Sequence, residues 1–135
     1  MITVSALTVS RGERVLFRDL SFHIAPGEAV ALTGANGAGK TSLLRALAGF
    51  IRPDAGIIAF ADSEPAEART RHIHWLGHQD GLKTGRRARD ELTFQSEWAG
   101  ADADGIAAAI DVLALEPLLD LEVRKLSAGQ RRRLA

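Results

Sequence analysis

The chain has 135 residues, of which 46% are hydrophobic and 25% charged, a balance typical of a globular protein with a core of its own. Its 17 basic residues cancel its 17 acidic residues, so the net charge gives no reason to expect a nucleic-acid partner, and we expect none. The lack of cysteine excludes disulfides and thiolate metal sites, and we find neither a signal peptide nor the roughly 18-residue apolar run of a membrane helix.

In chain order, the first elements that the sequence predicts are short strands. Residues 2–9 alternate between apolar and polar with one slip of phase, and residues 20–24 alternate cleanly, as half-buried strands do. Residues 29–32 form a continuous apolar run, which is typical of a strand covered on both faces. Residues 57–60 and 73–76 are apolar runs that we also predict to be strands.

Two regions of the sequence are predicted to be helical. After residue 40, leucines and alanines recur on one side of a helix that ends near Gly49. Between about residues 86 and 121 the composition becomes rich in Ala, Glu and Asp, and apolar residues share one helical face. Two arginine-rich runs, at 86–89 and 131–133, are interpreted as solvated helix faces.

Residues 34–41 read Gly-Ala-Asn-Gly-Ala-Gly-Lys-Thr and match the pattern G-x-x-x-x-G-K-[ST] of a phosphate-binding loop. Glycine lets the backbone curl around a polyphosphate, and the helix that follows directs its N-terminal amides at the same anion. A glycine-rich turn with a helix cap is the alternative, but the strand–loop–helix order favours nucleotide binding. We expect Lys40 to reach the β- and γ-phosphates, Thr41 to bind Mg²⁺ and Ser42 to contact the α-phosphate. The predicted nucleotide-binding residues are Gly34, Asn36, Gly37, Ala38, Gly39, Lys40, Thr41 and Ser42.

A second motif, Leu-Ser-Ala-Gly-Gln-Arg, stands at residues 126–131. By itself, Ser127 followed three residues later by Gln130 predicts a capping box that starts a helix. Together with the phosphate loop, however, the segment resembles the LSGGQ signature of the ABC-type ATPases, with Ala128 in place of the first glycine. The resemblance implies an α/β fold, that of a P-loop NTPase with an ABC nucleotide-binding domain, in which a mixed sheet carries a helical subdomain.

In that family the signature contacts the γ-phosphate of an ATP molecule held by the opposite subunit of a head-to-tail homodimer. The resemblance therefore implies ATP and Mg²⁺ as cofactors and assigns Ser127, Gly129 and Gln130 to the site, with Ser127 donating its hydroxyl and Gly129 its N–H. Gln79 follows the strand predicted at 73–76 and occupies the place of the family's Q-loop glutamine. In that role Gln79 would contact Mg²⁺ and the attacking water, and would sense a membrane partner.

The sequence departs from the family in two places. Arg11 stands where the family has an aromatic residue that stacks on adenine; an arginine plane can also stack on a base, and the nearby Phe17 is expected in the core. After Gly77 the sequence contains no apolar run followed by Asp-Glu, so the Walker B aspartate and the catalytic glutamate are not found. We therefore expect the N-terminal part of a longer protein, in which hydrolysis is not assigned to these residues alone.

The resemblance implies an incomplete nucleotide-binding domain with an ATP-binding core at about 1–84, a helical subdomain at about 85–126 and the signature at 126–135. Residues 75–84, Trp-Leu-Gly-His-Gln-Asp-Gly-Leu-Lys-Thr, more narrowly resemble the ATP-binding subunit of the haem exporter used in cytochrome c maturation. Beyond Thr84 the sequence departs from those subunits at Arg86, Arg87, Asp90 and Glu91.

The narrower resemblance implies an ATPase that couples ATP binding and hydrolysis to transport. It would work with transmembrane permease subunits, as a peripheral protein on the cytoplasmic face of the bacterial inner membrane. We interpret His78 and Lys83 as loop residues that dock this partner rather than as haem ligands. ABC ATPases for another cargo and a non-catalytic nucleotide-binding module remain as alternatives. A soluble ABC ATPase that acts on DNA or ribosomes would need coiled-coil insertions or a tandem domain, and the sequence shows neither.

Overall fold

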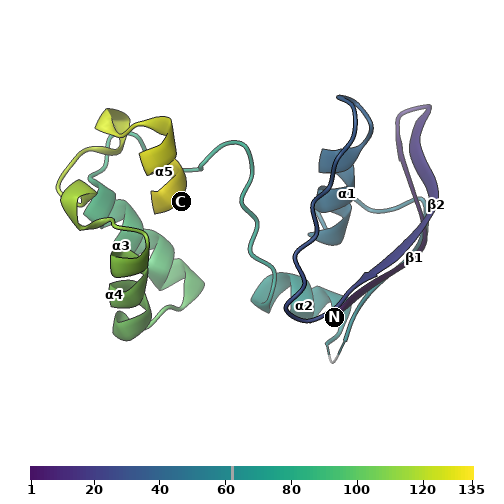
Figure 1. Cartoon of the computed structure of the whole chain (residues 1–135), viewed down its shortest axis with the longest axis horizontal. Helices are drawn as coiled ribbons and strands as arrows, with labels where there is room; N and C mark the ends of the chain where they lie inside the picture. The colour runs from purple at the N-terminus through teal and green to yellow at the C-terminus, as the bar shows by residue number, and fades with distance from the viewer. Residues whose placement is uncertain (62) are drawn as a thin grey trace. The chain divides into compact units, whose positions relative to one another are not determined.

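The computed structural model describes residues 1–61 and 63–135, and the chain divides into two units, Met1–Trp75 and Leu76–Ala135 (Figure 1). From the sequence we expected the helical part to begin near residue 85, whereas the second unit begins at Leu76 and takes in the segment around Gln79.

The described part of the first unit is built on an antiparallel sheet of three strands in the order β2-β1-β3. Strand β1 (Ile2–Arg11) pairs with β2 (Arg14–Ile24) on one side and with β3 (Ala55–Phe60) on the other. These strands confirm the predictions made for the same regions, although β2 begins earlier than its cleanest alternation suggested. Figure 1 shows β1 and β2 as a long hairpin.

The slip of phase in the first predicted strand is a β-bulge. Ala6 has a φ of +48°, and the register of β1 against β2 shifts between Val4 and Leu7. The bulge lets Val4, Leu7 and Val9 all face the core, where their exposed fractions are 2%, 0% and 1%. The bulge therefore explains why the apolar residues of this strand are irregularly spaced in the sequence and yet lie on one face of the sheet.

Helix α1 (Lys40–Leu47) confirms the helix predicted after the glycine-rich loop. It packs Leu43 and Ala46 into the same core cluster as the buried residues of the sheet. Helix α2 (Pro65–Arg71) follows β3 and was not predicted. Proline at its first position and the Ala-Glu-Ala-Arg run behind it are the sequence signal that could have identified this helix.

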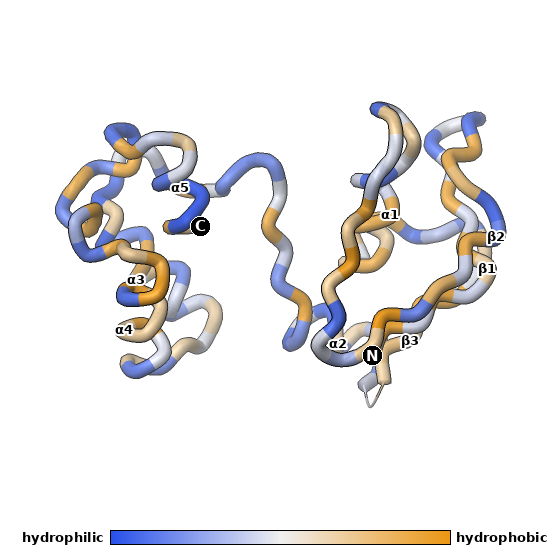
Figure 2. Tube along the Cα trace, viewed as in Figure 1, coloured by the Kyte–Doolittle hydropathy of each residue, from blue (hydrophilic) through white to orange (hydrophobic). Residues whose placement is uncertain are grey.

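Two of the predicted strands are wrong. Residues 29–32 and 73–76 take no regular secondary structure and join no sheet among the described residues. A strand needs a neighbour that pairs with its backbone donors and acceptors, and an apolar run does not reveal whether that neighbour is present. The apolar stretch before the loop, visible in Figure 2, instead lines an open groove of about 430 Å³, where Val30 is 57% and Leu32 39% exposed.

The second unit contains the helical region predicted for residues 86–121. Its helices are α3 (Ala88–Ala99), α4 (Ala103–Val112) and α5 (Ala128–Leu134), with 3-10 turns at Glu116–Leu118 and Val123–Lys125. Its buried core consists of Leu82, Ala88, Leu115, Leu118, Leu119, Val123, Leu126 and Leu134. The signature segment is thus anchored in the helical core at both ends. Within residues 1–61 and 63–135, none of the helices combines the length and the apolar character of a membrane span.

Most arginines of the two arginine-rich runs are exposed, as interpreted from the sequence, but several also make contacts within the second unit. In α5 each arginine of the run donates to a backbone carbonyl. The acceptors are the carbonyl oxygens of Leu126, Gly77 and Leu113, for Arg131, Arg132 and Arg133 respectively. In the other run, a guanidinium nitrogen of Arg86 lies 3.4 Å from a carboxylate oxygen of Glu91, whose side chain is 1% exposed. These arginines therefore face solvent and also connect neighbouring segments of the second unit.

Candidate functional site

The candidate site of the first unit is the glycine-rich loop before α1. Gly37 has a φ of +82° and Gly39 a φ of +93°, in the left-handed region that favours glycine. Within the loop the Ala38 N–H donates to the Ala35 carbonyl oxygen at 3.2 Å, which closes a tight turn. Residues 34–38 are exposed, so the curled backbone is accessible to an anion from solvent.

The side chain of Lys40 folds back over this loop. Its Nζ donates to the carbonyl oxygen of Gly34 at 2.6 Å and to that of Ala35 at 2.8 Å. An ammonium group has three donors, so one donor remains for a phosphate oxygen. The start of the loop therefore holds a positive charge, which a phosphate-binding loop uses to bind phosphate oxygens.

The N-terminus of α1 adds further donors to the same place. Gly39 is the N-cap, no side chain caps the helix, and its first turn contains no acidic residue. The Leu43 N–H donates to the Gly39 carbonyl oxygen at 2.9 Å, so the amides of residues 40–42 lie ahead of the first helical hydrogen bond. These amides and the positive end of the helix dipole favour an anion at the loop.

A cavity of about 280 Å³ joins the loop, the helix N-terminus and the end of β1. It is lined by Arg11, Leu16, Asn36, Gly37, Gly39, Lys40, Thr41 and Ser42. Six of the predicted residues therefore meet in one cavity. Of the other two, Gly34 accepts the hydrogen bond from Lys40, and Ala38 lines a cavity of about 120 Å³ that shares Gly39 and Lys40 with the first.

The hairpin supplies two residues to this cavity. Arg11, at the end of β1, lines this cavity. A residue that stacks on adenine in place of the family's aromatic side chain is expected in such a position. Arg11 also stands opposite Arg14 in the strand pair, where two like charges repel each other and an anion bound nearby would offset the repulsion. Leu16 was missed from the sequence, because only the pairing of β1 with β2 brings it to the loop. Phe17 packs against the core, as expected.

The surroundings of Thr41 bear on its predicted role as a ligand of Mg²⁺. Thr41 lies in the first turn of α1 and lines the cavity. The part of the chain that the structure describes has no group of three or more His, Cys, Asp or Glu that could hold a metal. A single hydroxyl fits Mg²⁺ that arrives with a nucleotide, because Mg²⁺ keeps several waters and takes phosphate oxygens as ligands.

In the second unit, the capping box predicted at the start of α5 is present. The Gln130 N–H donates to Oγ of Ser127 at 3.2 Å, and the Ser127 N–H donates to Oε1 of Gln130 at 2.8 Å. The cap uses only an acceptor site of the Ser127 hydroxyl, so its proton stays free to be donated to an anion. The structural and the functional interpretations of Ser127 are therefore compatible.

Gly129 lies in the first turn of α5, and nothing lies within 4 Å of the position that a Cβ would take. Its φ is not among the positive values found for other glycines. Neither backbone conformation nor packing within the unit therefore requires glycine at this position. Close approach of a ligand to the Gly129 N–H would explain why glycine stands at this position.

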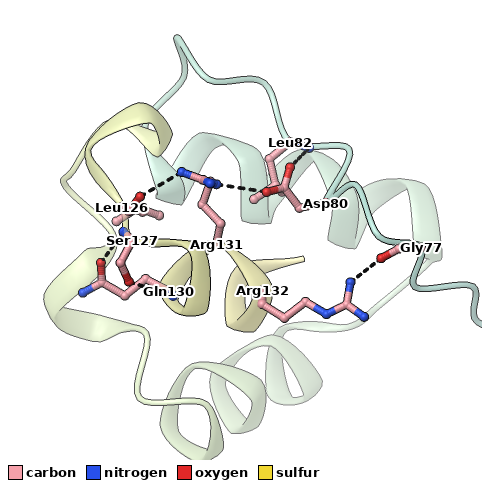
Figure 3. Close-up of polar contacts among 8 residues, drawn as sticks. All are labelled: Gly77, Asp80, Leu82, Leu126, Ser127, Gln130, Arg131 and Arg132. Carbon is pink, nitrogen blue, oxygen red and sulfur yellow. Dashed lines mark hydrogen bonds and ion pairs between the residues drawn. The ribbon is translucent and has the colours of Figure 1, made fainter.

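Gln79 is exposed and belongs to a segment that contacts α5. Figure 3 shows these contacts: Nε of Arg131 lies 3.0 Å from Oδ2 of Asp80, and Arg132 donates to the Gly77 carbonyl oxygen. Sequence reasoning missed Asp80 and Arg131, because residues 51 positions apart show no common pattern. The phosphate loop thus belongs to the first unit. The segment at residues 77–83, called the Gln79 segment below, lies beside the signature in the second unit.

Comparison with known proteins identifies this arrangement. The family model described as "ABC transporter" matches residues 17–135. The chain is 43% identical to the cytochrome c biogenesis ATP-binding export protein CcmA of Maricaulis maris, over 99% of this chain and 63% of that protein. It spans 62% to 65% of the length of three such proteins.

Solved structures agree on the fold. The chain superposes on cbiO1 of Clostridium perfringens, part of the ABC transporter complex cbiONQ, with a TM-score of 0.83 at 21% identity, covering 98% of this chain and 58% of that one. It also matches MJ0796, a bacterial ABC transporter cassette solved as a dimer, with a TM-score of 0.75 at 21% identity, covering 99% of this chain and 66% of that one. These matches confirm the nucleotide-binding fold predicted from the two motifs.

Proposed function

This chain belongs to the ABC transporter family, and from that premise we propose that it binds MgATP and forms part of the ATP-binding subunit of an ABC transporter. The observation that carries the proposal is the cavity of about 280 Å³ at the phosphate loop. There the Lys40 ammonium, the glycine-rich backbone and the start of α1 all direct positive charge and N–H donors to one place.

Within this site each residue takes a distinct part in binding ATP. The ammonium of Lys40 contacts the β- and γ-phosphates, the Thr41 hydroxyl contacts the Mg²⁺ that accompanies them, and the Ser42 hydroxyl contacts the α-phosphate. Asn36 and the glycines supply the curl of the loop. The guanidinium plane of Arg11 stacks on adenine where the cavity reaches the hairpin.

The signature contributes to a second ATP site, where it contacts the ATP molecule held by the phosphate loop of another subunit. In a head-to-tail homodimer, Ser127 donates its hydroxyl and Gly129 its N–H to the γ-phosphate that the opposite phosphate loop holds. The start of α5, capped locally by Ser127 and Gln130, supplies its N-terminal amides to the same anion. The dimeric state of the MJ0796 cassette, which shares this fold, supports the arrangement.

ATP-driven closure of that dimer is coupled to transport through Gln79. We place Gln79 against the Mg²⁺ and the attacking water when the site closes, with its loop in contact with the transmembrane permease subunits. ATP drives the permease only if closure of the ATPase dimer changes the free energy with which the dimer binds the permease subunits. Hydrolysis further needs a carboxylate that anchors the metal and a catalytic carboxylate that orients water, which Gln79 and Thr41 do not supply.

The cargo we propose is haem, exported for cytochrome c maturation from the cytoplasmic face of the bacterial inner membrane. Two observations support it: the Trp75–Thr84 segment, and relatives named cytochrome c biogenesis ATP-binding export protein at 43% and 47% identity. Deletion of the full-length gene should abolish covalent haem attachment to c-type cytochromes. A wild-type copy should restore attachment, and a Lys40→Ala copy should not. Normal c-type cytochromes in the deletion strain would contradict haem as the cargo and would support an ABC ATPase that transports another cargo.

A further inference from the structure

A hydrogen-bonded network connects the Gln79 segment to the start of α5 in the second unit (Figure 3). Oδ2 of Asp80 accepts from Nε of Arg131 at 3.0 Å, and Oδ1 of Asp80 accepts from the Leu82 N–H at 3.3 Å. One carboxylate therefore orders the backbone directly after Gln79 and also contacts the signature helix. Arg132 adds a second connection by donating to the carbonyl oxygen of Gly77.

The guanidinium of Arg131 extends this network to the signature itself. Its Nη1 donates to the carbonyl oxygen of Leu126 at 2.9 Å, and Leu126 immediately precedes Ser127. Because the donors of a guanidinium lie in one rigid plane, the two contacts of Arg131 fix the distance between Asp80 and Leu126. The neighbours of Gln79 and of Ser127 are thus held by a single side chain.

The Asp80–Arg131 pair differs from another ion pair of the same unit. The side chains of Asp80 and Arg131 are 30% and 32% exposed, so water and salt screen their attraction only in part. Arg89 and Asp120, by contrast, approach at 3.6 Å with side chains 53% and 79% exposed, where an ion pair contributes little. The exposed pair therefore serves as a matched control for the half-buried one.

We propose that Asp80 and Arg131 are positioning residues that couple the signature to Gln79, an inference that rests on the proposed function. When Ser127 and Gly129 engage the γ-phosphate held by the opposite subunit, the accompanying shift of α5 moves Asp80 through Arg131. Asp80 in turn moves Gln79, its neighbour in the chain. Capture of ATP at one site thereby sets the position of the glutamine that serves the other site of the dimer.

The experiment neutralises the pair with nearly isosteric changes in the full-length protein. Asp80→Asn keeps an oxygen for the Leu82 N–H and removes the charge, and Arg131→Gln removes the guanidinium. Each should lower kcat for ATP hydrolysis on the order of tenfold, because a misplaced Gln79 no longer aligns with the reacting atoms. MgATP affinity should not change, since neither residue belongs to the phosphate loop. Asp120→Asn, the same substitution in the exposed pair, should leave both quantities unchanged.

The double variant Asp80→Asn/Arg131→Gln decides whether the two residues act as one unit. Its kcat should fall no further than that of either single variant, because removing one partner already breaks the connection. An unchanged kcat in Asp80→Asn, additive losses in the double variant, or losses of kcat and MgATP affinity together would each overturn the proposal. If the wild-type protein itself fails to bind MgATP, the proposed function fails instead.

Discussion

A Cβ atom on Gly39 would lie 3.1 Å from Cδ1 of Phe17, closer than side chains normally approach. Cβ of Leu16 would be 3.2 Å away on the same strand. Phe17 packs against the core cluster of the first unit, so its ring cannot withdraw without disturbing that core. Strand β2 thereby sets the position of the residue that caps α1 and precedes Lys40.

Gly39→Ala should therefore destabilise the first unit. The φ of +93° is strained for alanine, and the methyl group meets Phe17, so we expect a loss of about 1–3 kcal/mol in the free energy of unfolding. Gly85→Ala is the control, because no positive φ is found at Gly85 and nothing lies within 4 Å of the Cβ position there. Chemical denaturation of both variants measures the difference. Equal stability of the two would contradict the packing argument.

Arg11→Ala should weaken ATP binding by roughly two- to fivefold, as expected for loss of about 0.5–1 kcal/mol of stacking at an exposed site. Binding of inorganic triphosphate should change less, because it has no base to stack on Arg11. Arg14→Ala, which alters the residue opposite Arg11 in the strand pair, is the control. Competition titrations with both ligands give the comparison. Equal losses for ATP and triphosphate would show that Arg11 acts on the phosphates.

Gly129→Ala should separate folding from function. The Cβ has open space and alanine favours helix over glycine by about 1 kcal/mol, so α5 should be as stable as before or more so. ATP-driven dimerisation of the full-length protein should nevertheless be lost, because the methyl group keeps the γ-phosphate from the Gly129 N–H. Ala128→Gly, which restores the first glycine of the family's signature, should keep dimerisation. Analytical ultracentrifugation with and without ATP measures both, and ATP-induced dimers of Gly129→Ala would refute the role.

The phosphate loop and the capping box were predictable because each is a local pattern with a local cause. Gly37 and Gly39 provide the positive φ values that the loop needs, and Ser127 caps the helix that begins beside it. The strand at 73–76 was predicted wrongly because strand formation depends on a distant neighbour. For the same reason the pairing of Asp80 with Arg131 left no sequence signal: it depends on how the second unit folds.

His78→Ala or Lys83→Ala should reduce binding of the membrane partner and leave MgATP affinity unchanged. Both side chains are exposed in the Gln79 segment, and neither lines the cavity at the phosphate loop. His74→Ala, an exposed histidine of the first unit, is the control. Co-purification of the permease with each full-length variant tests the docking role. Full recovery of the permease with both variants would place the docking surface elsewhere.

Calorimetric titration of the chain with MgATP tests the central claim most directly. Nζ of Lys40 lies 2.6 Å from the carbonyl oxygen of Gly34, the first residue of the loop. Lys40→Ala removes a charge-assisted contact of about 1.5–3 kcal/mol, so its affinity should be at least roughly tenfold lower, while Lys125→Ala should match the wild type. We predict saturable binding of one MgATP per chain, weakened by chelation of Mg²⁺. A folded wild-type chain without saturable binding, or a folded Lys40→Ala variant with wild-type affinity, would contradict the assignment of the phosphate loop.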